Sequence, residues 1–406
     1  MVPIYRQKRE KELISKETKR RNKMVGVAII GVGDIANIHI EAYQQLKGRC
    51  EIRALSDLYT IKAEEKAEKY GLLCDIVKDY KELLDREDIQ LISICLPPAA
   101  HCRVAVDFLM AGKHVLCEKP MASTLEECDK MLFAAQQGGA KLSVVAQNRF
   151  KQDVMKTKRF LDTGVLGDIY FAQANSLWWR GERYYDLWWR GTWEKEGGGC
   201  TFIHAVHHID LFLWLMGRVK EVNAFVSNQA HRNSEVEDLS ITTVRFENGA
   251  VGSLISSLLH HGEEQKFIID AQNGSIEIPH KIKVSYQMDN GYPQADDEKR
   301  KELEDLFGGI PDITYDGHCG QIENMLAAIE NDEELMITGE DGRRTIEFIS
   351  GVYQSAFTGT NTKFPMTKSD LFYTKEGILS KTIKFHEKVK SVENFADQGI
   401  SVGGSL

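Results

Sequence analysis

The fold is decided by the stretch Val25–Ala36, which reads VGVAIIGVGDIA. An apolar run ends at Gly31, where a GxGxxA pattern begins. In a strand-turn-helix unit the first glycine allows the tight turn, the second lets a pyrophosphate approach the backbone, and a small third residue lets the helix pack on the strand. The stretch therefore predicts a dinucleotide-binding unit, with Gly31, Gly33, Asp34 and Ile35 beside the phosphates.

A second signal of this unit lies 24 residues after Gly33, where Asp57 follows the predicted strand Glu51–Ser56. An acid at this place accepts hydrogen bonds from the adenosine ribose hydroxyls and repels a 2′-phosphate. NAD is therefore favoured over NADP, although Arg53 or Lys62 could offset the charge. Asp57 can also cap the following helix, and the two roles are compatible.

Short β-branched runs then alternate with amphipathic helical patterns, which predicts a parallel sheet. Further strands are expected at Leu91–Leu96, His114–Cys117 and Leu142–Ala146, which gives an NAD-binding domain over residues 24–147.

Two turns lie at the carboxyl edge of this predicted sheet, where open α/β sheets bind ligands. The first reads LPPAAH over residues 96–101, and the second reads EKP over residues 118–120. Pro120 favours an extended Lys119 and ends the strand. A lysine there can share the proton of a substrate hydroxyl beside a nicotinamide, whereas an isolated lysine is more often a surface residue.

These motifs together resemble the Gfo/Idh/MocA family of oxidoreductases, whose signature includes GxGxxA/G, a proline-containing turn that ends in histidine, and AGKHVxxEKP. The similarity runs from about Val25 to Pro365. It implies a Rossmann domain followed by an α/β domain with a large, open, mostly antiparallel sheet that is often used for oligomer contacts. The resemblance also makes Lys119 the catalytic lysine. The residues expected to line the cofactor at the two turns are Leu96, Pro97, His101, Glu118 and Lys119.

The second domain, expected over residues 148–366, contains an unusual aromatic cluster. Five of the six tryptophans fall within sixteen residues. The cluster consists of Trp178, Trp179, Arg180, Arg183, Tyr184, Tyr185, Trp188, Trp189, Arg190 and Trp193. Such side chains can bind the C–H face and the oxygens of a sugar, or they can form a wedge between domains or subunits. The resemblance favours the sugar, because WRGTW followed by an acid and three glycines is similar to members that act on pyranoses or nucleotide-sugars.

Residues 197–217 follow and read GGGCTFIHAVHHIDLFLWLMG, a glycine turn and then a buried helix. A lone histidine on such a helix is usually a core residue, but three lie within five residues. The resemblance places the family's histidine on His207, where it can exchange a proton near neutral pH, and its last acid on Asp210. The acid or amide expected at Ile203 is missing, so either His204 takes over that substrate contact or the substrate makes the contact differently.

No metal site is expected. His204 and His208 are four residues apart, as in HExxH, but there is no Glu base and no third ligand at a telling spacing. His318 faces either the cleft or the solvent. The side chains expected to contact the substrate are Asn148, Arg149, Trp179, Tyr185, Trp189, Arg190, His204 and Asp210.

Composition excludes several function classes. The 406 residues suffice for two domains, and a net charge of −9 gives no reason to expect nucleic acid or membrane binding. No run of about 18 apolar residues could span a bilayer. Eight scattered cysteines without CxxC spacing suit reduced thiols. We therefore expect a cytoplasmic protein. The resemblance implies a homo-oligomer, a dimer or tetramer, with a small carbohydrate or cyclitol as its partner.

Both ends of the chain are expected to be extensions. Residues 1–24 carry five Lys, four Arg and three Glu, which suits either a partner-binding arm or a solvated, disordered extension over residues 1–23. Residues 367–406 are expected to form a partly disordered C-terminal extension.

Three functions fit the sequence. The first is an NAD-dependent dehydrogenase that oxidises a secondary alcohol of a sugar, glycoside, nucleotide-sugar or cyclitol, with Lys119 and His207 moving the proton. The second is a redox-neutral glycosidase, in which tightly bound NAD forms a transient 3-keto sugar before elimination. The third is a non-catalytic NAD-binding regulator. Retention of Lys119 and His207 argues against the regulator, while the missing acid at Ile203 keeps it open.

Overall fold

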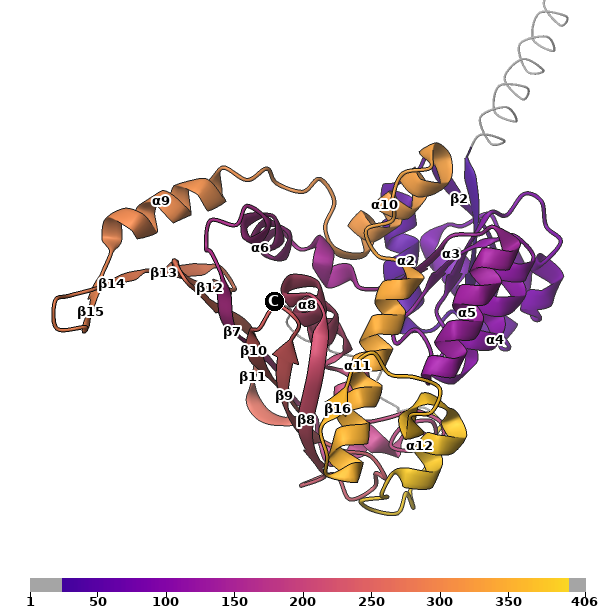
Figure 1. The fold of residues 1–406 in the computed structure, drawn as a ribbon. Helices are drawn as coiled ribbons and strands as arrows, with labels where there is room; N and C mark the ends of the chain where they lie inside the picture. Colours follow the sequence, from indigo (N-terminus) through magenta and orange to yellow (C-terminus); the bar gives the residue numbers. More distant parts are fainter. Residues whose placement is uncertain (1–23, 394–406) are drawn as a thin grey trace, which may run out of the picture. The chain divides into compact units, whose positions relative to one another are not determined.

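The computed structural model describes residues 24–393, which divide into two units (Figure 1). The first unit contains residues 24–118, 131–145 and 318–338, and the second contains residues 119–130, 146–317 and 339–393. The units interleave along the chain, because residues 318–338 return to the first unit. The predicted N-terminal extension and residues 394–406 of the predicted C-terminal extension lie outside the described residues.

The first unit is built on a parallel sheet of six strands in the order β3-β2-β1-β4-β5-β6. The strands are β1 (Val25–Ile30), β2 (Cys50–Ser56), β3 (Asp75–Val77), β4 (Leu91–Ile94), β5 (His114–Cys117) and β6 (Leu142–Val144). Its helices are α2 (Asp34–Gln45), α3 (Thr60–Tyr70), a 3-10 turn (Tyr80–Leu83), α4 (Pro98–Met110) and α10 (Gly317–Asn331), while α5 (Leu125–Gly138) belongs to both units. Every residue of β1 is buried, as in a sheet covered on both faces. The predicted Rossmann-type sheet is confirmed.

The second unit is built on a sheet of eight strands in the order β13-β12-β11-β7-β10-β9-β8-β16. The strands are β7 (Ile169–Trp179), β8 (Val219–Ser227), β9 (Leu239–Phe246), β10 (Val251–Ser257), β11 (Leu259–Ala271), β12 (Gly274–Ile278), β13 (Lys281–Lys283) and β16 (Thr362–Lys363). Only β7 and β10 pair in parallel, so the prediction of a mostly antiparallel sheet is confirmed. Strand β11 begins at Leu259 and includes the mostly polar residues 260–266.

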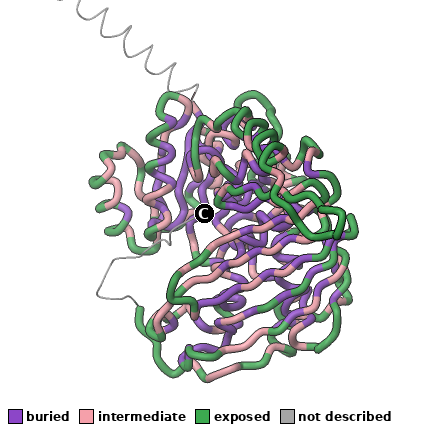
Figure 2. The backbone as a smooth tube through the Cα atoms, turned by 90° about the vertical axis from the view of Figure 1, so that its left-hand side faces the viewer, coloured by how far each residue is buried: buried purple, intermediate pink, exposed green. Residues whose placement is uncertain are grey.

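The second unit also contains helices and turns, some of which pack on this sheet. The helices are α6 (Gln152–Asp162), α7 (Cys200–Ile203), α8 (Val206–Met216), α9 (Asp297–Gly308), α11 (Gly339–Thr358) and α12 (Lys375–Lys381). The 3-10 turns lie at Gln147–Phe150, Glu182–Asp186 and Leu371–Tyr373. A small hairpin consists of β14 (Ser285–Gln287) and β15 (Pro293–Ala295). Helix α8 packs on β7, and α11 packs on β8. Buried and exposed residues alternate along β9, so the other face of the sheet is exposed (Figure 2).

The predicted buried helix after the three glycines is interrupted. Helix α7 ends at Ile203, and α8 begins at Val206, so His204 and Ala205 lie in the break. Helix α8 then ends before Gly217, whose φ of 87° suits glycine. Among residues 24–393, no helix combines the length and the apolar character that crossing a membrane requires.

Candidate active site

The glycine turn of the first unit leaves the start of α2 accessible. Gly31 has a φ of 88°, and a Cβ there would lie 2.7 Å from the Cys95 carbonyl oxygen, so only glycine fits. A Cβ at Gly33 would meet open space, and Gly33 and Asp34 are both exposed at the first turn of α2, while Ile35 packs against the core. No side chain caps this helix. A pyrophosphate can therefore approach the helix N-terminus, whose N–H groups and dipole favour anions.

Asp57 is held beside this turn. Its two carboxylate oxygens each accept a backbone hydrogen bond, from Val32 N–H and from Tyr59 N–H, both at 2.9 Å. This orients a partly exposed carboxylate that can still accept hydrogen bonds from a ribose.

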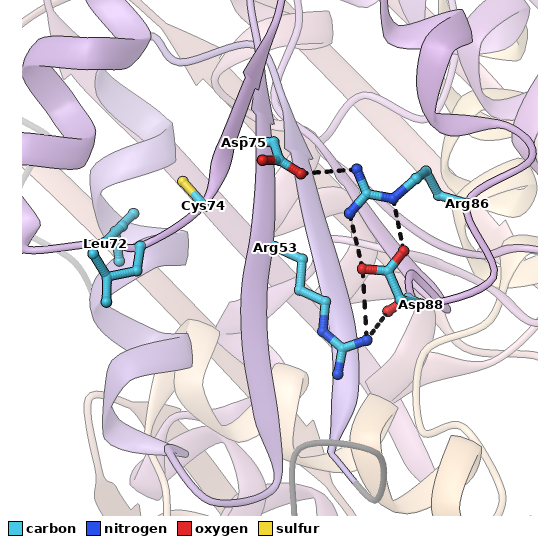
Figure 3. Close-up of a pocket in the computed structure, with 7 residues that line it drawn as sticks. Arg53, Leu72, Cys74, Asp75, Arg86 and Asp88 are labelled. Atoms are coloured by element: carbon cyan, nitrogen blue, oxygen red, sulfur yellow. Dashed lines mark hydrogen bonds and ion pairs between the residues drawn. The ribbon is translucent and has the colours of Figure 1, made fainter. Parts of the chain in front are cut away.

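Arg53, which could have offset the charge of Asp57, is engaged elsewhere. Its guanidinium donates to the Asp88 carbonyl oxygen and lies 3.4 Å from a carboxylate oxygen of Glu51. Figure 3 shows this group in a pocket where Arg86 also pairs with Asp75 and Asp88, so the charges there neutralise one another. Arg53 therefore pairs with Glu51 and Asp88 rather than with Asp57.

The turn after β4 is held by a buried histidine. His101, on α4, is 0% exposed, and its Nε2 donates to the Leu96 carbonyl oxygen at 2.7 Å. Pro97 caps α4 with an extended backbone. His101 therefore holds the Leu96-Pro97 backbone at the carboxyl edge of the sheet.

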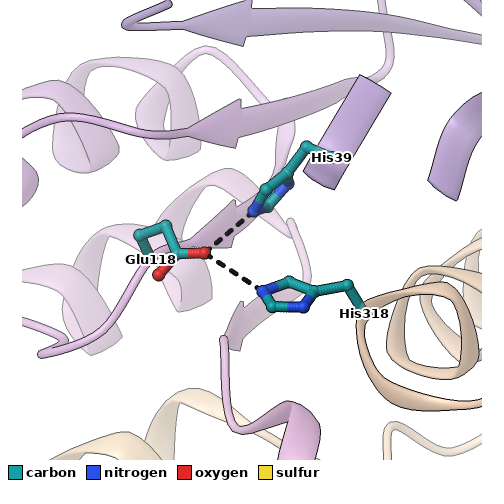
Figure 4. A group of neighbouring side chains, drawn as sticks. All are labelled: His39, Glu118 and His318. Atoms are coloured by element: carbon teal, nitrogen blue, oxygen red, sulfur yellow. Dashed lines mark hydrogen bonds and ion pairs between the residues drawn. The ribbon is translucent and has the colours of Figure 1, made fainter. Parts of the chain in front are cut away.

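A buried cluster of three side chains gathers at the carboxyl end of β5. His39 Nε2 on α2 lies 2.9 Å from Glu118 Oε1, and His318 Nε2 on α10 lies 3.5 Å from the same oxygen (Figure 4). The opposite nitrogen of His39, Nδ1, is 3.3 Å from Ser93 Oγ, which hydrogen-bonds in turn to the Tyr43 hydroxyl.

Electrostatics makes this cluster a buried ion pair. Burial alone would lower the pKa of His39, but Cys95 and Glu118 outweigh it and raise that pKa to about 10. Burial alone would raise the pKa of Glu118, but hydrogen bonds from His318 and His39 bring it well below its usual value. Ligand atoms of the three residues lie within 4.8 Å of one another, close enough for a divalent cation. Protonated His39 already supplies the positive charge that Glu118 needs.

Sequence reasoning missed His39 as a site residue and left His318 undecided. The three members are separated by more than 70 residues along the chain and come from three different elements. The one available signal was a histidine six residues after Gly33, on the face of α2 that packs against the sheet.

In the second unit, Lys119 lies within electrostatic range of His204, the first histidine after the three glycines. The pKa of His204 is well below its usual value because of burial and because of the charges of Arg180, Arg190, Lys119 and His207. Burial also lowers the pKa of His208, to about 3. Both residues are therefore neutral near pH 7. His207 is half-buried on the first turn of α8.

Arg149 and Asp210, both expected to contact the substrate, instead bind each other. The Arg149 guanidinium donates two hydrogen bonds to Asp210, at 2.8 and 2.7 Å, and both side chains are almost fully buried. Arg149 also lies 3.4 Å from Asp341 and stacks on Trp214. This network fixes α8, which bears His207, and Asn148 is buried beside Arg149 in the same turn.

The aromatic cluster forms one wall around His204. Tyr184 lies 5.5 Å from the His204 ring, and the Arg190 guanidinium stacks on Tyr184 and Trp189 at 4.1 Å. Arg190 is in turn paired with Glu196 at 3.1 Å. Burial raises the pKa of Glu196 to about 7, although Arg190 opposes this shift.

Tyr185 and Trp179, both expected to contact the substrate, do not pack against His204. Tyr185 is 1% exposed and packs on His231, so Tyr184 rather than Tyr185 lies beside His204. Trp179 ends β7 with 44% of its surface exposed, and its ring lies 5.4 Å from that of His261.

Comparisons with known proteins agree with these features. Residues 25–146 match a family model described as oxidoreductase family, NAD-binding Rossmann fold, and residues 154–277 match a model described as GFO/IDH/MocA C-terminal domain. D-glucoside 3-dehydrogenase of Escherichia coli is 27% identical over 357 residues, which cover 82% of this chain and 96% of that protein. Inositol 2-dehydrogenase of Salmonella typhimurium is 22% identical over 255 residues, which cover 62% and 73%.

A solved structure shows the same fold. The WlbA dehydrogenase of Bordetella pertussis, in complex with NADH and UDP-GlcNAcA, aligns with a TM-score of 0.73 and 26% identity. The alignment covers 85% of this chain and 100% of that one.

We expect Asp57→Ala to weaken NAD binding by about 10- to 100-fold, because a hydrogen bond to a charged group contributes about 1.5–3 kcal/mol. The ratio of NADP to NAD affinity should rise, since the repulsion of a 2′-phosphate is removed. Isothermal titration of the full chain with each nucleotide measures both. The matched control is Asp75→Ala, which removes an exposed acid paired with Arg86; equal losses in the two variants would contradict the assignment.

We expect His39→Gln to destabilise the protein by about 3–5 kcal/mol at pH 6.5, because Glu118 loses its charged partner. Since the pKa of His39 is raised, its contribution is fully present below about pH 6.5 and is lost as the pH rises through about 10. The melting temperatures of the two proteins should therefore converge between pH 6.5 and 9.5. A constant difference across this range would show that His39 is not charged in the folded protein.

Proposed function

The chain belongs to the Gfo/Idh/MocA family of oxidoreductases, with an NAD-binding Rossmann fold, and from this premise we propose that it oxidises a secondary alcohol of a sugar, glycoside, nucleotide-sugar or cyclitol. The position of Lys119 carries the proposal. This residue directly follows Glu118 at the carboxyl end of β5, and its charge acts on His204. The peptide bond alone keeps its Cα within about 3.8 Å of that of Glu118.

The relatives support the substrate class. By their names, two of them dehydrogenate a glucoside and inositol, and the WlbA dehydrogenase was solved with a nucleotide-sugar. All three substrates offer secondary alcohols on a ring. Stacked aromatic and guanidinium groups beside His204 suit such a ring, with Tyr184, Trp189 and Arg190 as the proposed contacts.

The residues of this chain have separable tasks in the proposed reaction. NAD, when bound, accepts the hydride from the alcohol carbon. Lys119 Nζ donates a hydrogen bond to the alcohol oxygen and stabilises the negative charge that develops as the O–H bond breaks. His207 receives that proton, because burial lowers the pKa of the neighbouring His204 and His208 and makes them weaker bases. The products are a ketone, NADH and one proton.

The other two functions make different predictions. A redox-neutral glycosidase would return the hydride and accumulate no NADH, and a regulator would bind NAD without turnover. The three relatives named above are dehydrogenases, which favours the first function. Net NADH formation at 340 nm with methyl β-D-glucopyranoside, levoglucosan and myo-inositol separates the three.

We expect Lys119→Met to lower kcat by at least about 1,000-fold, because the charge that stabilises the developing alkoxide is lost while the aliphatic stem remains. NAD affinity should stay within about threefold. Initial rates of NADH formation and isothermal titration measure the two effects. Lys130→Met is the matched control, since Lys130 is exposed and pairs only locally with Glu126; a Lys119 variant with near-normal kcat would sink the assignment.

We also propose a cytoplasmic homo-oligomer, a dimer or tetramer. All eight cysteines are free thiols, which suits a reducing compartment. The exposed face of the second sheet presents Phe225 and Ile241, 74% and 45% exposed, and these are directly paired across β8 and β9. Ile255 of β10 continues the row. Such an apolar row on an open sheet suits burial against a second copy of the chain.

The double variant Phe225→Glu, Ile241→Glu should therefore be a monomer at concentrations where the unchanged protein is a dimer or tetramer, because like charges would face one another in the interface. Light scattering coupled to size-exclusion chromatography gives the molar mass. Thr243→Glu, on the same exposed side of β9, is a milder control. An unchanged mass for the double variant would exclude this face as the interface.

A further inference from the structure

We propose that residues Ile383–Val392, here called the C-terminal strap, position the aromatic segment Tyr184–Trp193 and thereby set the affinity of the candidate active site for its sugar. The inference rests on the proposed function for the identity of the ligand. The strap belongs to the C-terminal extension, to which the sequence analysis assigned no function.

The strap first pairs with the segment as a short strand would. Val392 N–H donates to the Asp186 carbonyl oxygen at 2.8 Å, and Trp188 N–H donates to the Val392 carbonyl oxygen at 2.9 Å. Leu187 and Val392 thus form a parallel bridge. These two bonds hold the segment between Tyr184 and Trp189, the two rings on which Arg190 stacks.

Asn233 joins the strap and the segment through its side chain. Its Oδ1 accepts from the N–H groups of Val389 and Lys390, both at 2.9 Å. Its Nδ2 donates to the carbonyl oxygens of Lys390, at 3.1 Å, and Tyr185, at 3.3 Å, and to Asp186 Oδ1 at 2.9 Å. Asn233 is 4% exposed, so a loss of these partners would leave a buried amide unsatisfied.

Further contacts extend this attachment along the strap. Lys388 Nζ donates to the Tyr185 carbonyl oxygen. Trp193 Nε1, at the far end of the segment, donates to the Ile383 carbonyl oxygen at 3.1 Å. Lys384 pairs with Glu235 at 2.6 Å, and Phe385 N–H donates to the Glu235 carbonyl oxygen. The strap therefore touches both ends of the segment.

The segment needs such support because it has little structure of its own. Apart from the 3-10 turn Glu182–Asp186 and the bridge at Leu187, residues 180–196 contain no regular element that pairs them with the sheet. Fixing each backbone residue costs about 1–2 kcal/mol of conformational entropy, and contacts from outside must offset this. The strap provides such contacts through its bonds to Tyr185, Asp186, Trp188 and Trp193. Its proposed effect on the sugar passes through Tyr184, Trp189 and Arg190.

The test compares Val392→Pro with Val392→Ala in the full chain with NAD bound. Proline removes the N–H that reaches Asp186, whereas alanine keeps it. For Val392→Pro we expect a KM for methyl β-D-glucopyranoside about 5- to 20-fold higher, kcat changed less than about threefold, and NAD affinity unchanged. Amide hydrogen exchange over residues 184–193 should also be faster, with no change in β1 or β4. Val392→Ala should match the unchanged protein in every measurement.

A second pair of variants keeps the proposal falsifiable if the proline disturbs folding. Lys388→Met removes the hydrogen bond to Tyr185 and should raise KM about two- to fivefold, while Lys381→Met, an exposed residue of α12, should have no effect. Equal KM values and equal exchange over residues 184–193 in both pairs would overturn the proposal. If the unchanged protein oxidises none of the three test compounds, the proposed function fails, and the exchange rates alone decide whether the strap orders the segment.

Discussion

A buried carboxylate, Glu118, imposes the strictest physical demand on this protein. A carboxylate removed from water costs several kcal/mol unless a cation and hydrogen bonds accompany it. His39 and His318 meet that demand from two helices that are far apart in the sequence, and so they fix the end of β5. Lys119 follows by a single peptide bond, at the point where the chain passes from the first unit to the second. The proposed catalytic lysine is therefore anchored to the cofactor-binding sheet by its backbone, while its charge acts on His204 of the second unit.

The sequence predicted those features whose cause is local. The glycine turn and Asp57 belong to this group, because a tight turn and a strand end constrain the residues that occupy them. Features that depend on contacts between distant residues could not be predicted. The pairing of His39 with Glu118 is one, and the burial of Tyr185 in place of Tyr184 is another, since composition does not reveal which ring of a tyrosine pair turns inward. Arg149 and Asp210 looked like substrate ligands by position, yet they neutralise each other and hold α8. The strap gave no signal at all, because its bonds are made largely by backbone groups.

The candidate site of the second unit combines neutral histidines with charged arginine, lysine and glutamate side chains. Burial keeps His204 and His208 neutral, so they can accept or donate hydrogen bonds without adding to the positive charge of Arg180, Arg190 and Lys119. Glu196 pairs with Arg190, which stacks on Tyr184 and Trp189, and the Tyr184 ring lies beside His204. His204 stands beside Ile203, where the resemblance led us to expect an acid, and a neutral imidazole can still hydrogen-bond a sugar hydroxyl. The aromatic wall is thus built from side chains that depend on one another and on the strap.

The central claim is that a ring alcohol gives its hydride to NAD in the presence of Lys119. The most direct measurement is a single turnover of the full chain with NAD and methyl β-D-glucopyranoside that is deuterated at its ring carbons. Mass spectrometry then gives the deuterium content of the nucleotide and of the sugar. Levoglucosan and myo-inositol, deuterated in the same way, extend the measurement to the rest of the proposed substrate class. The account predicts NADH that carries one deuterium, formed in equal amount with a keto sugar. Unlabelled nucleotide with all three compounds, or cleavage of the glycoside without net NADH, would contradict it.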